Sequence, residues 1–114
     1  MPPSSVEHKI YRIHAELCKT LANPIRLEIL NLLRGGERSV NELTVLTGCA
    51  QATVSQHLAV LRQRGVVSTR KEGINVYYEI ANPKIIQACD IIRAVLFEQI
   101  ADMEKLARSE ATTR

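Results

Sequence analysis

Residues 39–65 of this 114-residue chain read SVNELTVLTGCAQATVSQHLAVLRQRG. Ser39 and Glu42 have the spacing of a capping box, in which each residue satisfies a free backbone amide of the other, so a short helix should begin after Ser39. This helix should end at Gly48, and a second helix should run from Gln51 to Gln63 and stop before Gly65. Apolar residues should hold both helices to a core, namely Leu43, Leu46, Val54, Leu58 and Leu61. The stretch therefore predicts two packed helices joined by a short turn.

The segments on either side extend this pattern. Apolar residues recur at helical spacing between His8 and Ala22, and Asn23-Pro24 suits the start of another helix, which should be buried and end at Gly35-Gly36. After Gly65, two β-rich stretches, Val66–Lys71 and Asn75–Ile80, indicate a hairpin. Pro83 should open a final helix of about 24 residues, which is about 36 Å long.

The order of these elements predicts a mainly α domain with a β-hairpin wing (α+β), that is, a winged helix-turn-helix. The final helix carries an apolar stripe longer than a domain of this size can cover, so we expect a symmetric dimer through the first and last helices. The alternative is that the final helix folds back on its own core. We expect a flexible tail at residues 1–6, the DNA-binding and dimerisation domain at 7–108, and a second flexible tail at 109–114.

Composition narrows the class of protein. Hydrophobic residues make up 46% of the chain, enough for one core, and no apolar run has the roughly 18 residues that a membrane span needs. The first residues, MPPSS, lack the pattern of a secretion signal, so we expect a cytoplasmic protein with no membrane partner. Net charge is +3, and between residues 49 and 78 four basic side chains face one acid, Glu72. A local positive face is typical of proteins with a polyanionic partner, although a solvated basic face is the commoner explanation.

The helix at 51–63 has the side chains to read base edges. With its apolar face turned inward, the opposite face carries amides, hydroxyls and an imidazole, and no acid occurs from Ala50 to Val67 to repel phosphate. The expected base-reading residues are Gln51, Thr53, Ser55, Gln56 and His57. The expected phosphate and wing contacts are Arg62, Arg64, Arg70 and Lys71. The alternative is an ordinary solvated helix.

Two stretches carry a resemblance to a known family. LCKTLANPIRLEIL at residues 17–30 and QATVSQHLAVLR at 51–62, followed by Gly65-Val66-Val67 and the wing, resemble the ArsR/SmtB family of repressors over about residues 10–100. The resemblance implies a homodimer, joined by the first and last helices, that binds a double-stranded DNA operator of inverted-repeat symmetry. It also implies release by an inducer.

None of the family's usual metal sites has a full set of metal ligands here. Where the family often has a cysteine pair on the helix that follows Ser39, this chain has Thr44 and Leu46. Where some members have cysteines on the helix at 51–63, it has Val60 and Arg64. The positions of the site that others form on the last helix correspond approximately to Asn82, Lys84, Val95 and Glu98. One carboxylate cannot make a zinc site, which needs about four ligands. We therefore expect no metal and no cofactor, and the inducer stays unidentified.

Three cysteines remain, with an odd count that disfavours a disulfide framework. Cys18, Cys49 and Cys89 fit as small packing residues. The alternative is a thiol- or soft-metal-responsive sensor through Cys18 and Cys89, which His14 could join because it lies four residues before Cys18.

Other functions fit the sequence less well. A regulator controlled by its abundance or a protein partner would need no inducer. A non-enzymatic interaction adaptor would leave the basic residues around an acid-free helix unexplained. An enzyme is the weakest alternative, because His57 has no nucleophile or acid near it in the sequence and no phosphate-binding loop is present. We therefore expect a sequence-specific transcriptional regulator without catalytic activity.

Overall fold

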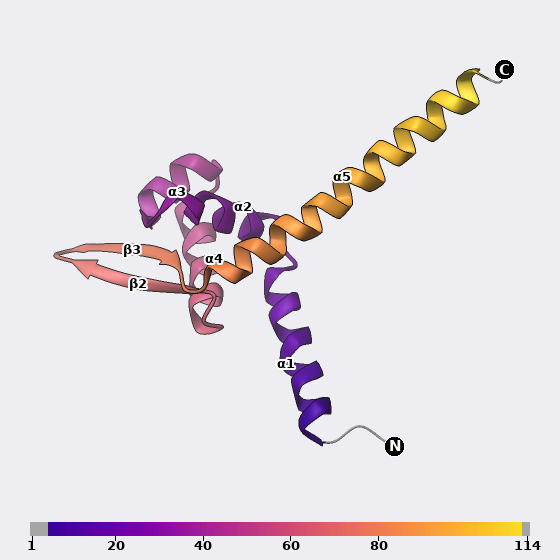
Figure 1. The fold of residues 1–114 in the computed structure, drawn as a ribbon. Coiled ribbons are helices and arrows are strands. Elements are labelled where there is room, and N and C mark those ends of the chain that lie inside the picture. The colour runs from indigo at the N-terminus through magenta and orange to yellow at the C-terminus, as the bar shows by residue number, and fades with distance from the viewer. Residues whose placement is uncertain (1–4, 113–114) are drawn as a thin grey trace. The chain divides into compact units, whose positions relative to one another are not determined.

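The computed structural model describes residues 5–112, which form two compact units divided after Asn82. The first unit holds α1 (Ser5–Leu21), α2 (Pro24–Leu32), a short 3-10 turn (Leu33–Gly35), β1 (Arg38–Ser39), α3 (Val40–Thr47), α4 (Gln51–Gln63), β2 (Val67–Glu72) and β3 (Asn75–Ile80). The second unit is the single helix α5 (Pro83–Thr112). This order confirms the mainly α fold with a β-hairpin wing (Figure 1).

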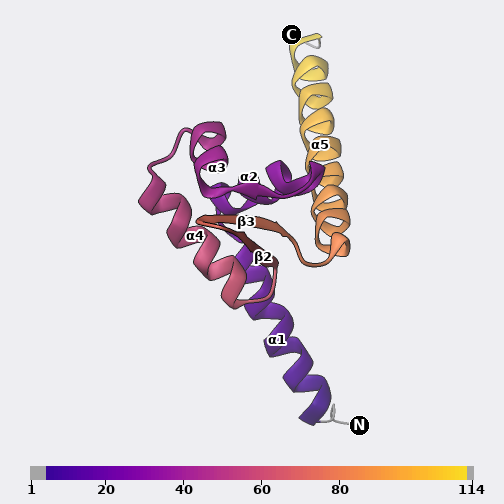
Figure 2. The ribbon, with the colours of Figure 1, turned by 90° about the vertical axis from the view of Figure 1, so that its left-hand side faces the viewer.

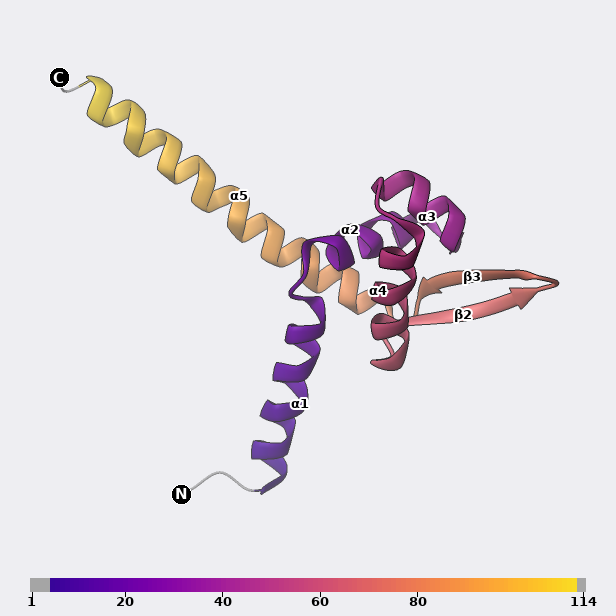
Figure 3. The same cartoon turned by 180° about the vertical axis from the view of Figure 1, so that it is seen from behind.

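The first unit is built around α2, α3 and α4, which pack on one another and on the root of the hairpin (Figure 2). Asn23 caps α2, accepting hydrogen bonds from the amides of Ile25 and Arg26, and Pro24 occupies its first turn. The core consists of aliphatic side chains that are at most 2% exposed: Ile29, Leu30, Leu33, Leu43, Val54, Leu58, Leu61, Val66 and Val67. The predicted inner face of α4 is therefore confirmed. α2 is buried at Ile29 and Leu30, but it is not buried all round as expected, because its Leu27 is 37% exposed. In contrast, α1 extends away from this cluster (Figure 3).

The sheet has three antiparallel strands in the order β1-β3-β2. β1 was not predicted, because two residues are too few to show an alternating pattern. β2 begins one residue later than expected because Val66 belongs to the turn that ends α4, where its amide donates to the Leu61 carbonyl at 2.9 Å. Gly65, with φ 74°, supplies the left-handed residue of that turn.

Two further expectations need correction. Leu46 is 47% exposed and does not anchor α3, which is held instead by the fully buried Leu43. The final helix has 30 residues and not about 24, because neither glycine nor proline interrupts the chain after Pro83. The expected tails overlap residues outside the described range, 1–4 and 113–114. Of the remainder, Ser5 and Val6 belong to α1, and residues 109–112 belong to α5.

Candidate nucleic-acid interface

Helix α3, which leads into the turn before α4, is fixed at both ends by local chemistry. The hydroxyl of Ser39 accepts from the amide of Glu42, and a carboxylate oxygen of Glu42 accepts from the amide of Ser39, both at 3.2 Å. This is the predicted capping box. At the other end Gly48 adopts φ 72° and donates its amide to the Thr44 carbonyl at 3.0 Å. The entry of α4 is therefore set by the backbone of α3.

α4 has one buried face and one exposed face. Val54, Leu58 and Leu61 are 0% exposed, as the sequence predicted. On the other face Gln51, Ser55 and Gln56 are exposed and Thr53 is half-buried. No acidic residue occurs in the helix. α4 thus presents amides and hydroxyls to solvent without a repelling carboxylate on the helix itself.

His57 lies differently from the other expected base-reading residues. It is half-buried, and its Nδ1 accepts a hydrogen bond from Nε of Arg26 at 3.1 Å. Burial, and then the charge of Arg26, lower the pKa of His57 from its ordinary value, so the neutral imidazole is favoured. Sequence reasoning missed Arg26, because 31 residues separate it from His57 and no local pattern links them.

The four expected phosphate-binding cations fall into two pairs. Arg62 and Lys71 are exposed and make no hydrogen bond or ion pair within residues 5–112. Arg64 and Arg70 instead have acidic partners, Glu16 and Glu37, which lie 48 and 33 residues away in sequence. Sequence reasoning identified the cations but not these carboxylates, since nothing in the spacing points to them.

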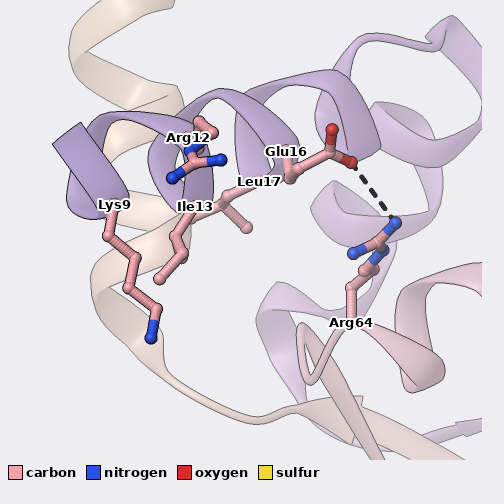
Figure 4. A pocket seen from close by; sticks show the side chains of 6 residues that line it. All are labelled: Lys9, Arg12, Ile13, Glu16, Leu17 and Arg64. Carbon is pink, nitrogen blue, oxygen red and sulfur yellow. Dashed lines mark hydrogen bonds and ion pairs between the residues drawn. The ribbon is translucent and has the colours of Figure 1, made fainter. Parts of the chain in front are cut away.

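Arg64 connects the end of α4 to α1. Its Nη2 lies 3.3 Å from a carboxylate oxygen of Glu16, beside an open hollow of about 470 Å³ (Figure 4). The hollow is lined by two apolar residues, Ile13 and Leu17, and four charged residues, Lys9, Arg12, Glu16 and Arg64. Because Gln51 and Arg64 lie at opposite ends of α4, a distance of about 20 Å along its axis, Arg64 is remote from the start of the reading face.

Arg70 lies on the wing, two residue pairs before the β2–β3 turn, and binds two carboxylates. It donates to Glu37 from Nη2 at 2.6 Å and from Nε at 3.1 Å, and to Glu72 from Nη1 at 2.9 Å. Its guanidinium carbon also lies 4.9 Å from the centroid of the Tyr77 ring. The hydrogen bond from Arg70 lowers the pKa of Glu37, and the two carboxylates raise the pKa of Arg70.

The tip of the wing faces the starts of α3 and α4 across a second, smaller hollow of about 200 Å³. Ile74, at the turn between β2 and β3, is 98% exposed. Polar and apolar side chains line the hollow together: Ser39, Val40, Asn41, Gln51, Ile74, Asn75 and Val76. The wing and the starts of α3 and α4 therefore border one concave surface.

The three cysteines and His14 lie on different parts of the chain. Cys18 and His14 are exposed on α1, Cys49 is half-buried in the turn before α4, and Cys89 is half-buried on α5. Within residues 5–112 no group of three or more His, Cys, Asp or Glu side chains is close enough to bind a metal ion. A sensing role for Cys18, Cys89 and His14 stays a prediction.

The packed helices, the turn and the hairpin define a winged helix-turn-helix domain. The family profile described as "Bacterial regulatory protein, arsR family" matches residues 23–69. The HTH-type transcriptional regulator Rv0081 of Mycobacterium tuberculosis is 42% identical over 94 residues, which are 82% of each chain. This chain belongs to the ArsR family of bacterial transcriptional regulators.

Two further relatives describe the family in more detail. The biofilm growth-associated repressor of Agrobacterium fabrum is 41% identical over 81 residues, covering 71% of this chain and 69% of the repressor. The homodimeric winged helix-turn-helix DNA-binding domain of Mb0332 from Mycobacterium bovis has a TM-score of 0.77 and 34% identity, covering 86% of this chain and 91% of that domain. The members of the matched family are bacterial regulatory proteins. None of the helices described here is long and apolar enough to cross a membrane.

Proposed function

We propose that this chain is a cytoplasmic, non-enzymatic repressor that binds an inverted-repeat operator in double-stranded DNA as a homodimer. The observation that carries the proposal is the division of α4. Three fully buried side chains anchor one face, and an exposed face free of acids lies opposite. The major groove admits a helix with such a face, and side-chain amides can bond adenine edges bidentately.

The proposed contacts follow from the position of each side chain. Bases are read by Gln51, Thr53, Ser55 and Gln56, and His57 contributes through Nε2, since its Nδ1 is occupied by Arg26. Arg62 and Lys71, which have no partner within residues 5–112, contact phosphates. Arg64 and Arg70 add positive charge to the same surface, but each is already ion-paired, Arg64 with Glu16 and Arg70 with Glu37.

Exposed apolar side chains support a dimer through the first and last helices. Both α1 and α5 carry rows of them in the single chain, which a second copy would remove from water. They are Val6, Ile10 and Ile13 on α1, and Ile92, Val95, Leu96, Ile100, Met103 and Leu106 on α5. A two-fold dimer requires a two-fold operator, hence the inverted repeat.

Selection from random DNA tests the proposal. The purified chain is incubated with duplexes of about 30 random base pairs, a length that holds two half-sites one helical turn apart, and the bound fraction is amplified and sequenced. We expect an inverted repeat to emerge, and the dissociation constant for it to rise steeply between 50 and 200 mM salt, by about a thousandfold or more if six or more phosphates are contacted. Failure to enrich any sequence would reject the proposal.

The selected duplex also addresses what releases the protein. An exposed Cys18 favours a thiol- or soft-metal-responsive sensor as the second candidate function. Titrations of the duplex with and without reductant, and with arsenite, are repeated with Cys18→Ser and Cys89→Ser. Release that requires either thiol would support sensing, and release or retention that ignores both substitutions would reject it in favour of another inducer.

A further inference from the structure

One arginine side chain crosses the whole width of the sheet at the outer end of its three-stranded part. Arg70 on β2 is paired in register with Tyr77 on β3, and Tyr77 is paired with Ser39 on β1. The guanidinium of Arg70 passes over the Tyr77 ring and donates twice to Glu37, which lies just before β1. A single side chain thereby connects one edge of the sheet to the chain entering the opposite edge.

This connection falls where the sheet changes from three strands to two. Tyr77 is the residue of β3 nearest the tip that pairs with β1, and beyond it Val76 and Asn75 pair with β2 alone. An isolated pair of strands is weakly stable and twists strongly. The part of the wing beyond Tyr77 therefore takes its direction from the contacts that hold the sheet at Arg70 and Tyr77.

The charge of Arg70 is already balanced by protein groups. Glu37 is held by two hydrogen bonds and Glu72 by a third, at distances typical of charge-assisted pairs. A phosphate would have to displace a bidentate carboxylate to gain the same contacts. The next residue, Lys71, points to the other face of the strand because side chains alternate, and it has no partner within residues 5–112.

We propose that Glu37 and Arg70 form a clasp that fixes the angle of the wing tip, so that both act as positioning residues for DNA contacts made beyond them. This inference rests on the proposed DNA binding and assigns the direct wing contact with phosphate to Lys71. Opening the clasp lets the tip sample more directions, so a smaller fraction of molecules is competent to bind. The apparent affinity falls by that fraction.

The test compares Glu37→Gln with the matched control Glu28→Gln on the selected operator duplex. Glu28 is exposed on α2 and makes no interaction within residues 5–112, and both substitutions remove one negative charge and keep the size of the side chain. Arg70→Gln, the double variant and Lys71→Gln complete the set. Dissociation constants are measured at four salt concentrations, together with thermal midpoints, which should change little because the clasp is an exposed ion pair.

We expect Glu37→Gln and Arg70→Gln each to bind about three- to tenfold more weakly than Glu28→Gln. The salt slope, that is, the decrease of log K with log salt concentration, should equal that of the wild type. The double variant should be no weaker than the weaker single variant, while Lys71→Gln should lower the slope by about 0.9. The clasp is rejected if Glu37→Gln binds as tightly as Glu28→Gln or more tightly, or if Arg70→Gln lowers the slope by about 0.9, since Arg70 would then be a phosphate ligand for which Glu37 competes. Wild-type protein that prefers no sequence rejects the proposed function itself, and the clasp with it.

Discussion

Nε of Arg26 on α2 lies 3.1 Å from Nδ1 of His57 on α4 and donates a hydrogen bond to it. The same guanidinium donates from Nη1 to the carbonyl of Thr20, near the end of α1, at 3.0 Å. One side chain thus connects three helices, including the proposed recognition helix. Nδ1 can accept this hydrogen bond only when it carries no proton, so the contact favours the neutral imidazole with its proton on Nε2.

Replacing Arg26 should loosen this junction. Arg26→Leu removes both hydrogen bonds while keeping an aliphatic side chain, and we expect the free energy of unfolding to fall by about 1–2 kcal/mol. Urea denaturation followed by circular dichroism measures the change. Arg62→Leu is the control, because Arg62 is an exposed arginine on a helix with no partner within residues 5–112. An equal loss of unfolding free energy in the two variants would mean that the hydrogen bonds of Arg26 do not stabilise the fold.

The lowered pKa of His57 predicts a loss of stability in mild acid. Its pKa in the folded chain lies below the ordinary value of 6.5, so on acidification the unfolded chain binds the proton first. The contribution of His57 is therefore fully present above pH 6.5 and is lost as the pH falls through the folded-state pKa. We expect the unfolding free energy to decline between pH 7.5 and 5.5, above the range where carboxylates titrate.

His57→Gln separates this effect from other titrations. The amide oxygen of glutamine can accept from Arg26 but does not titrate in this range. We expect the decline between pH 7.5 and 5.5 to be smaller in the variant than in the wild type, measured by urea denaturation at both pH values. A variant that loses as much stability as the wild type would show that His57 is not the responsible group.

The sequence predicted those parts of the fold that local chemistry determines. The capping box at Ser39 and Glu42 and the αL glycines at 48 and 65 act over a few residues, and periodicity alone identifies Val54, Leu58 and Leu61 as buried. The prediction that Leu46 is buried rested on the same periodicity and was wrong. The spacing of Leu46 fits the apolar pattern of α3, but the helix is short and no other element covers that position.

The electrostatic partners could not be predicted in this way. Arg64 with Glu16, Arg70 with Glu37 and Arg26 with His57 join residues 48, 33 and 31 positions apart. A sequence shows that cations surround α4, yet only the folded chain shows which of them are already paired. The division between Arg62 and Lys71 on one side and Arg64 and Arg70 on the other is the main refinement that the structure brings to the expected interface.

The buried face of α4 should carry a measurable share of stability. Val54→Ala removes two methyl groups from a side chain that is 0% exposed, and we expect the unfolding free energy to fall by about 2 kcal/mol or more. Val45→Ala makes the same chemical change in a helix at a position that is 80% exposed, and should stay within about 0.5 kcal/mol of the wild type. Thermal and urea denaturation of the pair measure the difference. If both variants unfold alike, the burial of Val54 does not stabilise the fold.

Substitutions of base-reading and phosphate-binding residues of α4 should have different effects on DNA binding. Gln56→Ala removes an exposed amide, and we expect lost preference at one position of each half-site, with about 1–3 kcal/mol less discrimination and an unchanged salt slope. Arg62→Gln should weaken binding to all duplexes alike and lower the salt slope by about 0.9, because it removes a phosphate contact. Titration of the selected operator and its single-base variants at several salt concentrations measures both. Should Gln56→Ala weaken all duplexes equally, Gln56 would be a backbone contact and base reading would have to come from Gln51, Thr53 and Ser55.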